Sequence, residues 1–197
     1  MSVTVEKAAA PTLTYAQYLA EGEINRRYEI LDGVRLWMPN PTVRQQDVLF
    51  NVATALKSFG RVSGLGRMVV AACDVLITYQ PLRVRQPDVL FISQARVGDR
   101  DPLDPSALNP APELVVEVLS PNDTWKDTWR ALDDKILDYC AVDVRKCWIV
   151  RTTSRTVEVL RLTRDGEQPV AIYAEGQAVP SVAFPGLSVP VADVFAL

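Results

Sequence analysis

The sequence predicts an α/β (α+β) fold, in which helices flank a mixed β-sheet. Two long segments, 42–59 and 124–140, carry apolar residues at the spacing of an amphipathic helix. Short runs rich in β-branched residues lie between and after them. A strand at 114–119 followed by a helix and then another strand is typical of a sheet with helices packed on it.

The N-terminal part of the chain predicts a flexible leader over residues 1–11, followed by a single domain over residues 12–197. Thr14 is placed to cap a short helix over 15–20. Two apolar runs within 27–38 flank Asp32-Gly33, a pair that tolerates the positive φ angles of a type I′ turn. The domain therefore begins with a predicted helix and a β-hairpin.

The remaining elements follow from the same signals. Gly60, Gly64 and Gly66 are expected to end the first long helix. Residues 93–112, rich in Asp and Pro, are expected to form a long loop. The predicted strands are 67–72, 75–79, 87–92, 114–119, 147–150 and 156–162, with a strand-like tail after Gly166.

Composition excludes several classes of function. A net charge of −3 gives no overall basic surface, so DNA would have to bind through local patches, metal ions or a dimer cleft. The chain has no histidine, which excludes Ser-His-Asp chemistry and histidine bases, and its three cysteines lack zinc-site spacing. With no run of about 18 apolar residues and no signal peptide, the chain is expected to be cytoplasmic, without membrane contact.

Three ionisable residues form a candidate site. Asp88 lies in Gln-Pro-Asp-Val-Leu-Phe-Ile, and Glu117 interrupts the apolar run Leu-Val-Val-Glu-Val-Leu. A carboxylate among β-branched residues is costly to bury unless it is paired or binds a metal. Strand alternation places Glu117 on the face of Val115 and Leu119, and Lys135 lies beside the apolar stripe of the following helix. Carboxylate oxygens on neighbouring strands suit Mg²⁺ or Mn²⁺.

Lys135 would then orient a water molecule or stabilise negative charge on a phosphoryl group. Burial and nearby carboxylates shift the pKa of a lysine in opposite directions, so whether it acts as a base stays open. Each residue also has a purely structural interpretation. Asp88 could end a strand, Glu117 could form a buried ion pair, and Lys135 could be a solvated helix residue. Further arginines near the site could contact phosphates or simply form a solvated surface, namely Arg83, Arg85, Arg96 and Arg100.

Five segments, in this order, resemble the Uma-two family, whose members are assigned as restriction endonucleases with the PD-(D/E)XK nuclease fold. They are Arg-Tyr-Glu-Ile-Leu-Asp-Gly (27–33), Gln-Pro-Asp-Val-Leu-Phe-Ile (86–92), Pro-Glu-Leu-Val-Val-Glu-Val-Leu-Ser-Pro (112–121), Lys-Ile-Leu-Asp-Tyr (135–139) and Cys-Trp-Ile-Val (147–150). The resemblance covers about residues 12–162 and implies that the domain over 12–197 has a restriction-endonuclease-like core.

The resemblance also implies roles for individual residues. Asp88 and Glu117 would be the metal-binding carboxylates, Lys135 the motif lysine moved onto a helix, and Glu29 a supporting acid. The usual position of that lysine, two residues after the glutamate, is Leu119. Many relatives carry a histidine where this chain has Arg44-Gln45-Gln46.

Three hypotheses follow from these residues. The leading one is a Mg²⁺- or Mn²⁺-dependent DNA endonuclease that acts as a homodimer, because cutting both strands requires two sites. The second is a protein with a nuclease fold that no longer cuts DNA and serves as a DNA-binding or regulatory protein. The third is another carboxylate-pair hydrolase such as a glycosidase, which would need no metal and would leave Lys135 unexplained.

Overall fold

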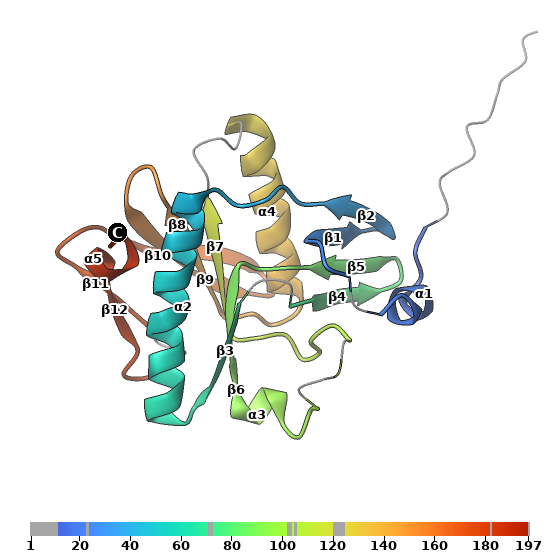
Figure 1. Cartoon of the computed structure of the whole chain (residues 1–197), viewed down its shortest axis with the longest axis horizontal. Helices are drawn as coiled ribbons and strands as arrows, with labels where there is room; N and C mark the ends of the chain where they lie inside the picture. The colour runs from blue at the N-terminus through green and yellow to red at the C-terminus, as the bar shows by residue number, and fades with distance from the viewer. Residues whose placement is uncertain are drawn as a thin grey trace, which may run out of the picture.

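The computed structural model describes residues 12–22, 24–70, 73–101, 104, 106–119, 125–181 and 183–196, and for residues 125–130 the backbone alone. The expected leader over 1–11, and the expected helix start at residue 124, lie outside these residues. The family fold expected from the sequence is present: a mixed sheet flanked by helices, preceded by a short helix and a hairpin (Figure 1).

The main sheet has six strands in the order β10-β9-β8-β7-β6-β3. Its central pair, β7 and β8, is parallel, whereas the other neighbours are antiparallel. A parallel pair needs a crossover connection, which α4 (Trp125–Ala141) provides between these two strands. The strands are β3 (Gly66–Val70), β6 (Val89–Ser93), β7 (Leu114–Leu119), β8 (Lys146–Arg151), β9 (Thr156–Thr163) and β10 (Gly166–Tyr173).

A second, antiparallel sheet has the order β2-β1-β5-β4, and lies beside the main sheet near α4 (Figure 1). Asp32 and Gly33 join its hairpin with φ angles of 51° and 79°, as the predicted type I′ turn requires. The short strand Leu82–Arg85 is not among the strands predicted from the sequence, although its alternation of apolar residues with arginines is the pattern of a half-buried strand. The strands are β1 (Tyr28–Leu31), β2 (Val34–Trp37), β4 (Val75–Tyr79) and β5 (Leu82–Arg85).

Helices cover both faces of the main sheet. On one face α2 (Val43–Ser63) packs Val48, Val52 and Leu56 against the strands. On the other face α4 packs Leu132, Ile136 and Tyr139. The predicted alternation on β7 is therefore correct: its even-numbered residues face α2, and its odd-numbered residues, including Glu117, face α4. The buried Cys140 and Cys147 belong to the α4 core, as expected of small apolar residues.

The prediction that Gly60 ends α2 is wrong. The helix continues to Ser63 and ends at Gly64, which has a left-handed φ of 67°. A Cβ on Gly60 would lie 2.8 Å from the Gly66 carbonyl oxygen and 3.1 Å from the Phe91 ring, so this glycine permits close packing of the helix on β3 and β6. The predicted loop over 93–112 also contains a short helix, α3 (Gln94–Val97).

The remaining elements lie near the chain ends. A capping box between Thr14 and Gln17 starts α1 (Tyr15–Ala20), where the sequence predicts a cap. Near the C-terminus β11 (Ala178–Pro180) pairs with β12 (Ser188–Pro190), and α5 (Val191–Val194) packs near α2. Within the described residues, no helix has both the length and the apolar character needed to cross a membrane.

Candidate active site

The centre of the candidate site is Glu117, which is 4% exposed on β7. Lys135 Nζ lies 3.0 Å from Glu117 Oε2, and the Tyr139 hydroxyl donates a 2.7 Å hydrogen bond to Oε1. Lys135 and Tyr139 are four residues apart on α4, so both side chains reach the same point on the sheet. The structure thus brings together Glu117 and Lys135, which the sequence places 18 residues apart.

Glu29 joins the same cluster from β1 of the second sheet. Its Oε1 lies 2.9 Å from Lys135 Nζ, and Arg85 Nη1 donates a 2.7 Å hydrogen bond to its Oε2. Glu29 is 3% exposed, so both of its oxygens meet cations away from water. Lys135 therefore bridges the carboxylates of two different sheets.

The cluster continues to a residue that the sequence analysis missed. Arg85 Nε lies 2.6 Å from Asp138, and Arg83 Nε lies 2.8 Å from the same carboxylate. Arg83 also pairs with Asp32 at 3.2 Å. Asp138 follows Lys135 by three residues on α4, a helical spacing that could have identified it.

Arg83 and Arg85 lie two residues apart on β5, and their side chains are engaged within the protein rather than left free for phosphates or solvent. Both guanidinium groups are engaged by Asp138, and Arg85 is fully buried. Arg96 pairs with Glu113 and Asp143. Arg100 donates hydrogen bonds to the backbone carbonyl and to the side-chain hydroxyl of Ser106.

Asp88 lies at the start of β6, beside the Glu117 strand. Its backbone N–H donates to the Val116 carbonyl, and its Oδ2 accepts a 2.7 Å hydrogen bond from the Val118 backbone N–H. Its Oδ1 pairs with Arg27 Nη2 at 2.8 Å. Backbone pairing thus places Asp88 beside Glu117, and Arg27 is a second contact that the sequence analysis missed.

The start of α2 also reaches this point. Gln45 closes the helical capping box with Thr42, and its Nε2 donates a 3.3 Å hydrogen bond to the Val118 carbonyl oxygen. Gln45 belongs to the Arg44-Gln45-Gln46 segment at the start of α2. The Val118 carbonyl, which follows Glu117 in the chain, therefore accepts a hydrogen bond from an amide side chain.

The carboxylates around Lys135 act on its charge. Burial alone would lower its pKa, but Glu117, Glu29 and Asp88 raise it, and the net pKa lies above the ordinary value. The surrounding carboxylates therefore favour the ammonium form of Lys135.

The two glutamates that share Lys135 are shifted in opposite directions. Burial raises the pKa of Glu117, opposed by Lys135, while Asp88 and Glu29 raise it further. Burial also acts to raise the pKa of Glu29, but Lys135 and Arg85 outweigh it and hold this pKa below the ordinary value. The difference follows from the cations: Glu29 contacts two, and Glu117 contacts one.

The donor set fits a hard divalent cation. Within the described part of the chain no three His, Cys, Asp or Glu residues form a ready metal cluster. Asp88 and Glu117 would supply two carboxylates, and Mg²⁺ commonly takes one or two carboxylates, with water and phosphate completing its shell. Each oxygen of these carboxylates already has a protein partner, so binding would replace contacts such as Arg27 on Asp88.

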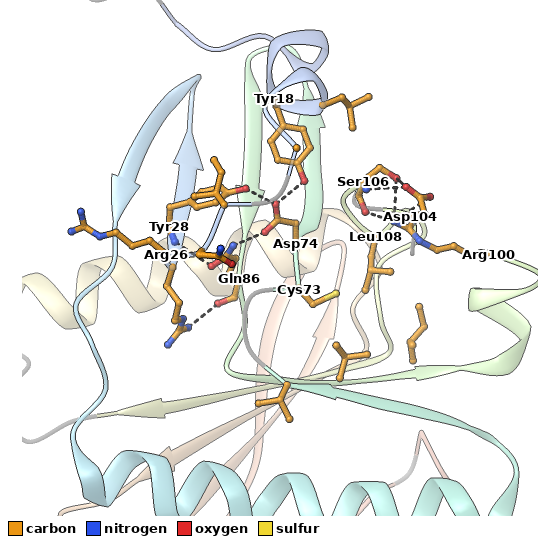
Figure 2. Close-up of a pocket in the computed structure, with 18 of the residues that line it drawn as sticks. Tyr18, Arg26, Tyr28, Cys73, Asp74, Gln86, Arg100, Asp104, Ser106 and Leu108 are labelled. Atoms are coloured by element: carbon orange, nitrogen blue, oxygen red, sulfur yellow. Dashed lines mark hydrogen bonds and ion pairs between the residues drawn. The ribbon is translucent and has the colours of Figure 1, made fainter. Parts of the chain in front are cut away.

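A cavity of about 830 Å³ adjoins the Asp88 side of the site. Arg27 and Gln86 line it, and these residues contact or neighbour Asp88. At its centre Asp74 accepts hydrogen bonds from the Tyr18 and Tyr28 hydroxyl groups and from Gln86 Nε2 (Figure 2). Sequence analysis did not single out Asp74, because its donors come from segments distant in sequence.

Comparisons with known proteins bear on the family and the fold of the chain. A family model described as "Putative restriction endonuclease", that of the Uma2 family, matches residues 14–192. A crystal structure from Anabaena variabilis ATCC 29413, described as "a putative nuclease belonging to DUF820", has a TM-score of 0.73 and 18% identity, covering 93% of this chain and 97% of that chain. Comparison with curated proteins gives no significant match. The family model spans most of the sequence, and the chain therefore belongs to the Uma2 family.

Proposed function

We propose that this protein is a Mg²⁺- or Mn²⁺-dependent DNA endonuclease that hydrolyses phosphodiester bonds. The observation that carries the proposal is the buried Glu117–Lys135 pair beside Asp88. A carboxylate pair suits a hard cation, and a fixed ammonium group next to it suits a reaction that builds negative charge on phosphate. Membership of the Uma2 family is consistent with this chemistry.

In this proposal Asp88 and Glu117 hold the divalent cation, with the Val118 carbonyl as a further oxygen donor. A bound divalent cation lowers the pKa of water and offsets the charge of a phosphate oxygen. Lys135 stays protonated and stabilises negative charge that develops on the phosphoryl group. Glu29 contacts Lys135 and is therefore the residue that fixes the ammonium position.

A silent DNA-binding protein is the second candidate. The observation in its favour is that every oxygen of Asp88 and Glu117 already has a protein donor, including Arg27. Such a site is stable without a metal. In that case the protein would bind DNA but leave plasmid intact with either cation.

The experiment combines metal calorimetry with plasmid cleavage on the same samples. The wild type should bind Mn²⁺ and cut plasmid DNA, whereas Asp88→Asn and Glu117→Gln should lose both properties. The matched control is Asp165→Asn, an exposed acid in the turn between β9 and β10 that should behave as wild type. Absence of metal binding rejects the proposed metal site and favours the silent protein, and metal binding without cleavage rejects the endonuclease.

We also propose that the active form is a homodimer, because cutting both strands of a duplex requires two sites. Light scattering during size-exclusion chromatography, with and without duplex DNA, tests this. A particle of twice the 21.8 kDa chain mass supports the dimer. A monomer that only nicks plasmid would contradict it.

A further inference from the structure

The two candidate metal-binding carboxylates differ in how firmly their cations are held. Glu117 pairs with Lys135, a buried residue that also pairs with Glu29. Lys135 can leave Glu117 only by weakening its contact with a second buried carboxylate. Asp88 pairs with Arg27 instead, and among the described residues Arg27 forms no ion pair with another carboxylate. The cation on Asp88 is therefore the easier one to exchange.

The contacts of Arg27 allow its guanidinium group to leave Asp88. Arg27 Nη2 donates hydrogen bonds of 2.8 Å to Asp88 Oδ1 and 3.4 Å to the Gln86 carbonyl oxygen, and its Nε is buried with no hydrogen-bond partner among the described atoms. The side chain is 21% exposed and lines the cavity of about 830 Å³. The Arg27 carbonyl oxygen accepts a 3.0 Å hydrogen bond from the Met38 backbone N–H. The side chain therefore has space to turn away while its backbone stays in place.

The Asp88 carboxylate is held in place independently of Arg27. Its Oδ2 accepts a hydrogen bond from the Val118 N–H, and the Asp88 N–H donates to the Val116 carbonyl oxygen. Both partners are backbone groups of β7, so these contacts remain when Arg27 moves. A divalent cation at Oδ1 would meet a guanidinium group already within hydrogen-bonding distance, and two positive charges so close together repel each other. Cation binding at Oδ1 and the Arg27 contact therefore oppose each other.

We propose that Arg27 is a positioning residue that occupies the metal-binding oxygen of Asp88 and leaves it when a divalent cation binds. In the metal-free protein the guanidinium group supplies the positive charge that a buried carboxylate needs. The same contact lowers the affinity of the site for the cation, because a charge-assisted hydrogen bond has to be broken each time the cation binds. This inference rests on the proposed function, since it takes Asp88 as a metal ligand.

Calorimetry with Mn²⁺ on the full chain tests this exchange without any cleavage. Arg27→Gln should bind Mn²⁺ about tenfold more tightly than the wild type, because no ion pair with Asp88 has to be broken. Arg27→Lys keeps a positive charge at this position and should have an affinity between the two. Arg26→Gln is the matched control, since it removes the same charge from the neighbouring residue, which lies over the Trp37 ring at 4.7 Å. Its affinity should stay within about twofold of the wild type, because solvent and salt screen an exposed charge.

Thermal unfolding gives a second readout, which stays informative if Arg27→Gln is less stable than the wild type. In EDTA the variant should unfold at a lower temperature, because Asp88 has lost its cation. A fixed concentration of Mn²⁺ should then raise the unfolding temperature of Arg27→Gln more than that of the wild type, because stabilisation by a ligand grows with its affinity. The additional rise should disappear in the double variant Asp88→Asn/Arg27→Gln, which would assign it to Asp88. An equal rise in Arg27→Gln and the wild type would overturn the inference.

Plasmid cleavage on the same samples separates this inference from the proposed function. If the wild type binds Mn²⁺ and cuts plasmid, but Arg27→Gln binds Mn²⁺ no more tightly than Arg26→Gln, the endonuclease stands and the exchange at Asp88 is rejected. If Arg27→Gln binds Mn²⁺ more tightly through Asp88 but neither protein cuts with Mg²⁺ or Mn²⁺, the exchange stands and the endonuclease is rejected. If neither the wild type nor Arg27→Gln binds Mn²⁺, the metal site is rejected, and the exchange with it.

Discussion

The two faces of β7 differ in what they do for the protein. On the α2 face Leu114, Val116 and Val118 belong to an apolar core with Trp148. On the α4 face the same strand places Glu117 between Val115 and Leu119, in contact with a lysine. Apolar burial is a direct source of stability, whereas a buried ion pair recovers little more than its own desolvation cost. Both faces therefore carry an apolar core, but only the α4 face also buries an ion pair on β7.

The largest change should come from removing the cation on the charged face. Lys135→Met leaves Glu117 and Glu29 without their shared ammonium group, and should lower the free energy of unfolding by about 3–5 kcal/mol. Urea unfolding measures this. The double variant Glu117→Gln/Lys135→Met should lose less than the sum of the single changes, because the buried charge that lost its partner is removed as well. Strict additivity would mean that the two groups do not interact.

On the α2 face a substitution should lower the stability of the fold without changing the charged site. Leu114→Ala should lower the free energy of unfolding by about 2–5 kcal/mol, because it opens a cavity in the α2 core. Metal binding per folded molecule should stay at the wild-type level. If Leu114→Ala abolished metal binding in protein that is still folded, the separation of the two faces would be wrong.

A smaller loss is expected from Tyr139→Phe. The variant removes the hydroxyl group that donates to Glu117 Oε1 and leaves the ring in place, which should cost about 1.5–3 kcal/mol. Thermal unfolding at neutral pH measures this. Tyr173→Phe, on β10, is the control and should be nearly neutral. An equal loss of stability in the two variants would show that the hydrogen bond from Tyr139 to Glu117 contributes no more than an ordinary tyrosine hydroxyl group.

The smallest expected effect concerns Glu29, and it is a change in how the free energy of unfolding depends on pH. Because the folded-state pKa of Glu29 is lowered, its ionisation stabilises the fold above the ordinary pKa of about 4.3, and this contribution is lost as pH falls through the folded-state value. Glu29→Gln should therefore differ from the wild type more at pH 7 than at pH 3. The difference is about 1.4 kcal/mol for each unit of lowering. A difference independent of pH would contradict the assigned cause.

Much of this arrangement can be predicted from local pattern. The alternation of β7 predicts the face of Glu117, and Asp32-Gly33 predicts a type I′ turn. Lys135 was expected beside the apolar stripe of its helix, and it reaches Glu117 from there. These predictions are correct because they depend on periods of two and 3.6 residues, which the sequence records directly.

Predictions that depend on distant segments were less successful. The sequence does not reveal that Asp138 lies opposite Arg83 and Arg85. Glycine is typical of a helix end, but Gly60 lies inside α2. There the absence of a side chain permits close contact between the helix and β3. Arg27 meets Asp88 across 61 residues. In each case tertiary packing decides the outcome, and no local period encodes it.

The ion-paired groups of the site also have a net charge that couples its ligands. Leaving out the exposed Asp32, the paired carboxylates and cations are Glu117, Glu29, Asp138 and Asp88 with Lys135, Arg85, Arg83 and Arg27, four negative groups against four positive. With all groups ionised their net charge is zero; a divalent cation would make it +2, and one phosphodiester would lower it to +1. Metal and DNA should therefore bind with positive cooperativity, each raising the affinity for the other by the same factor.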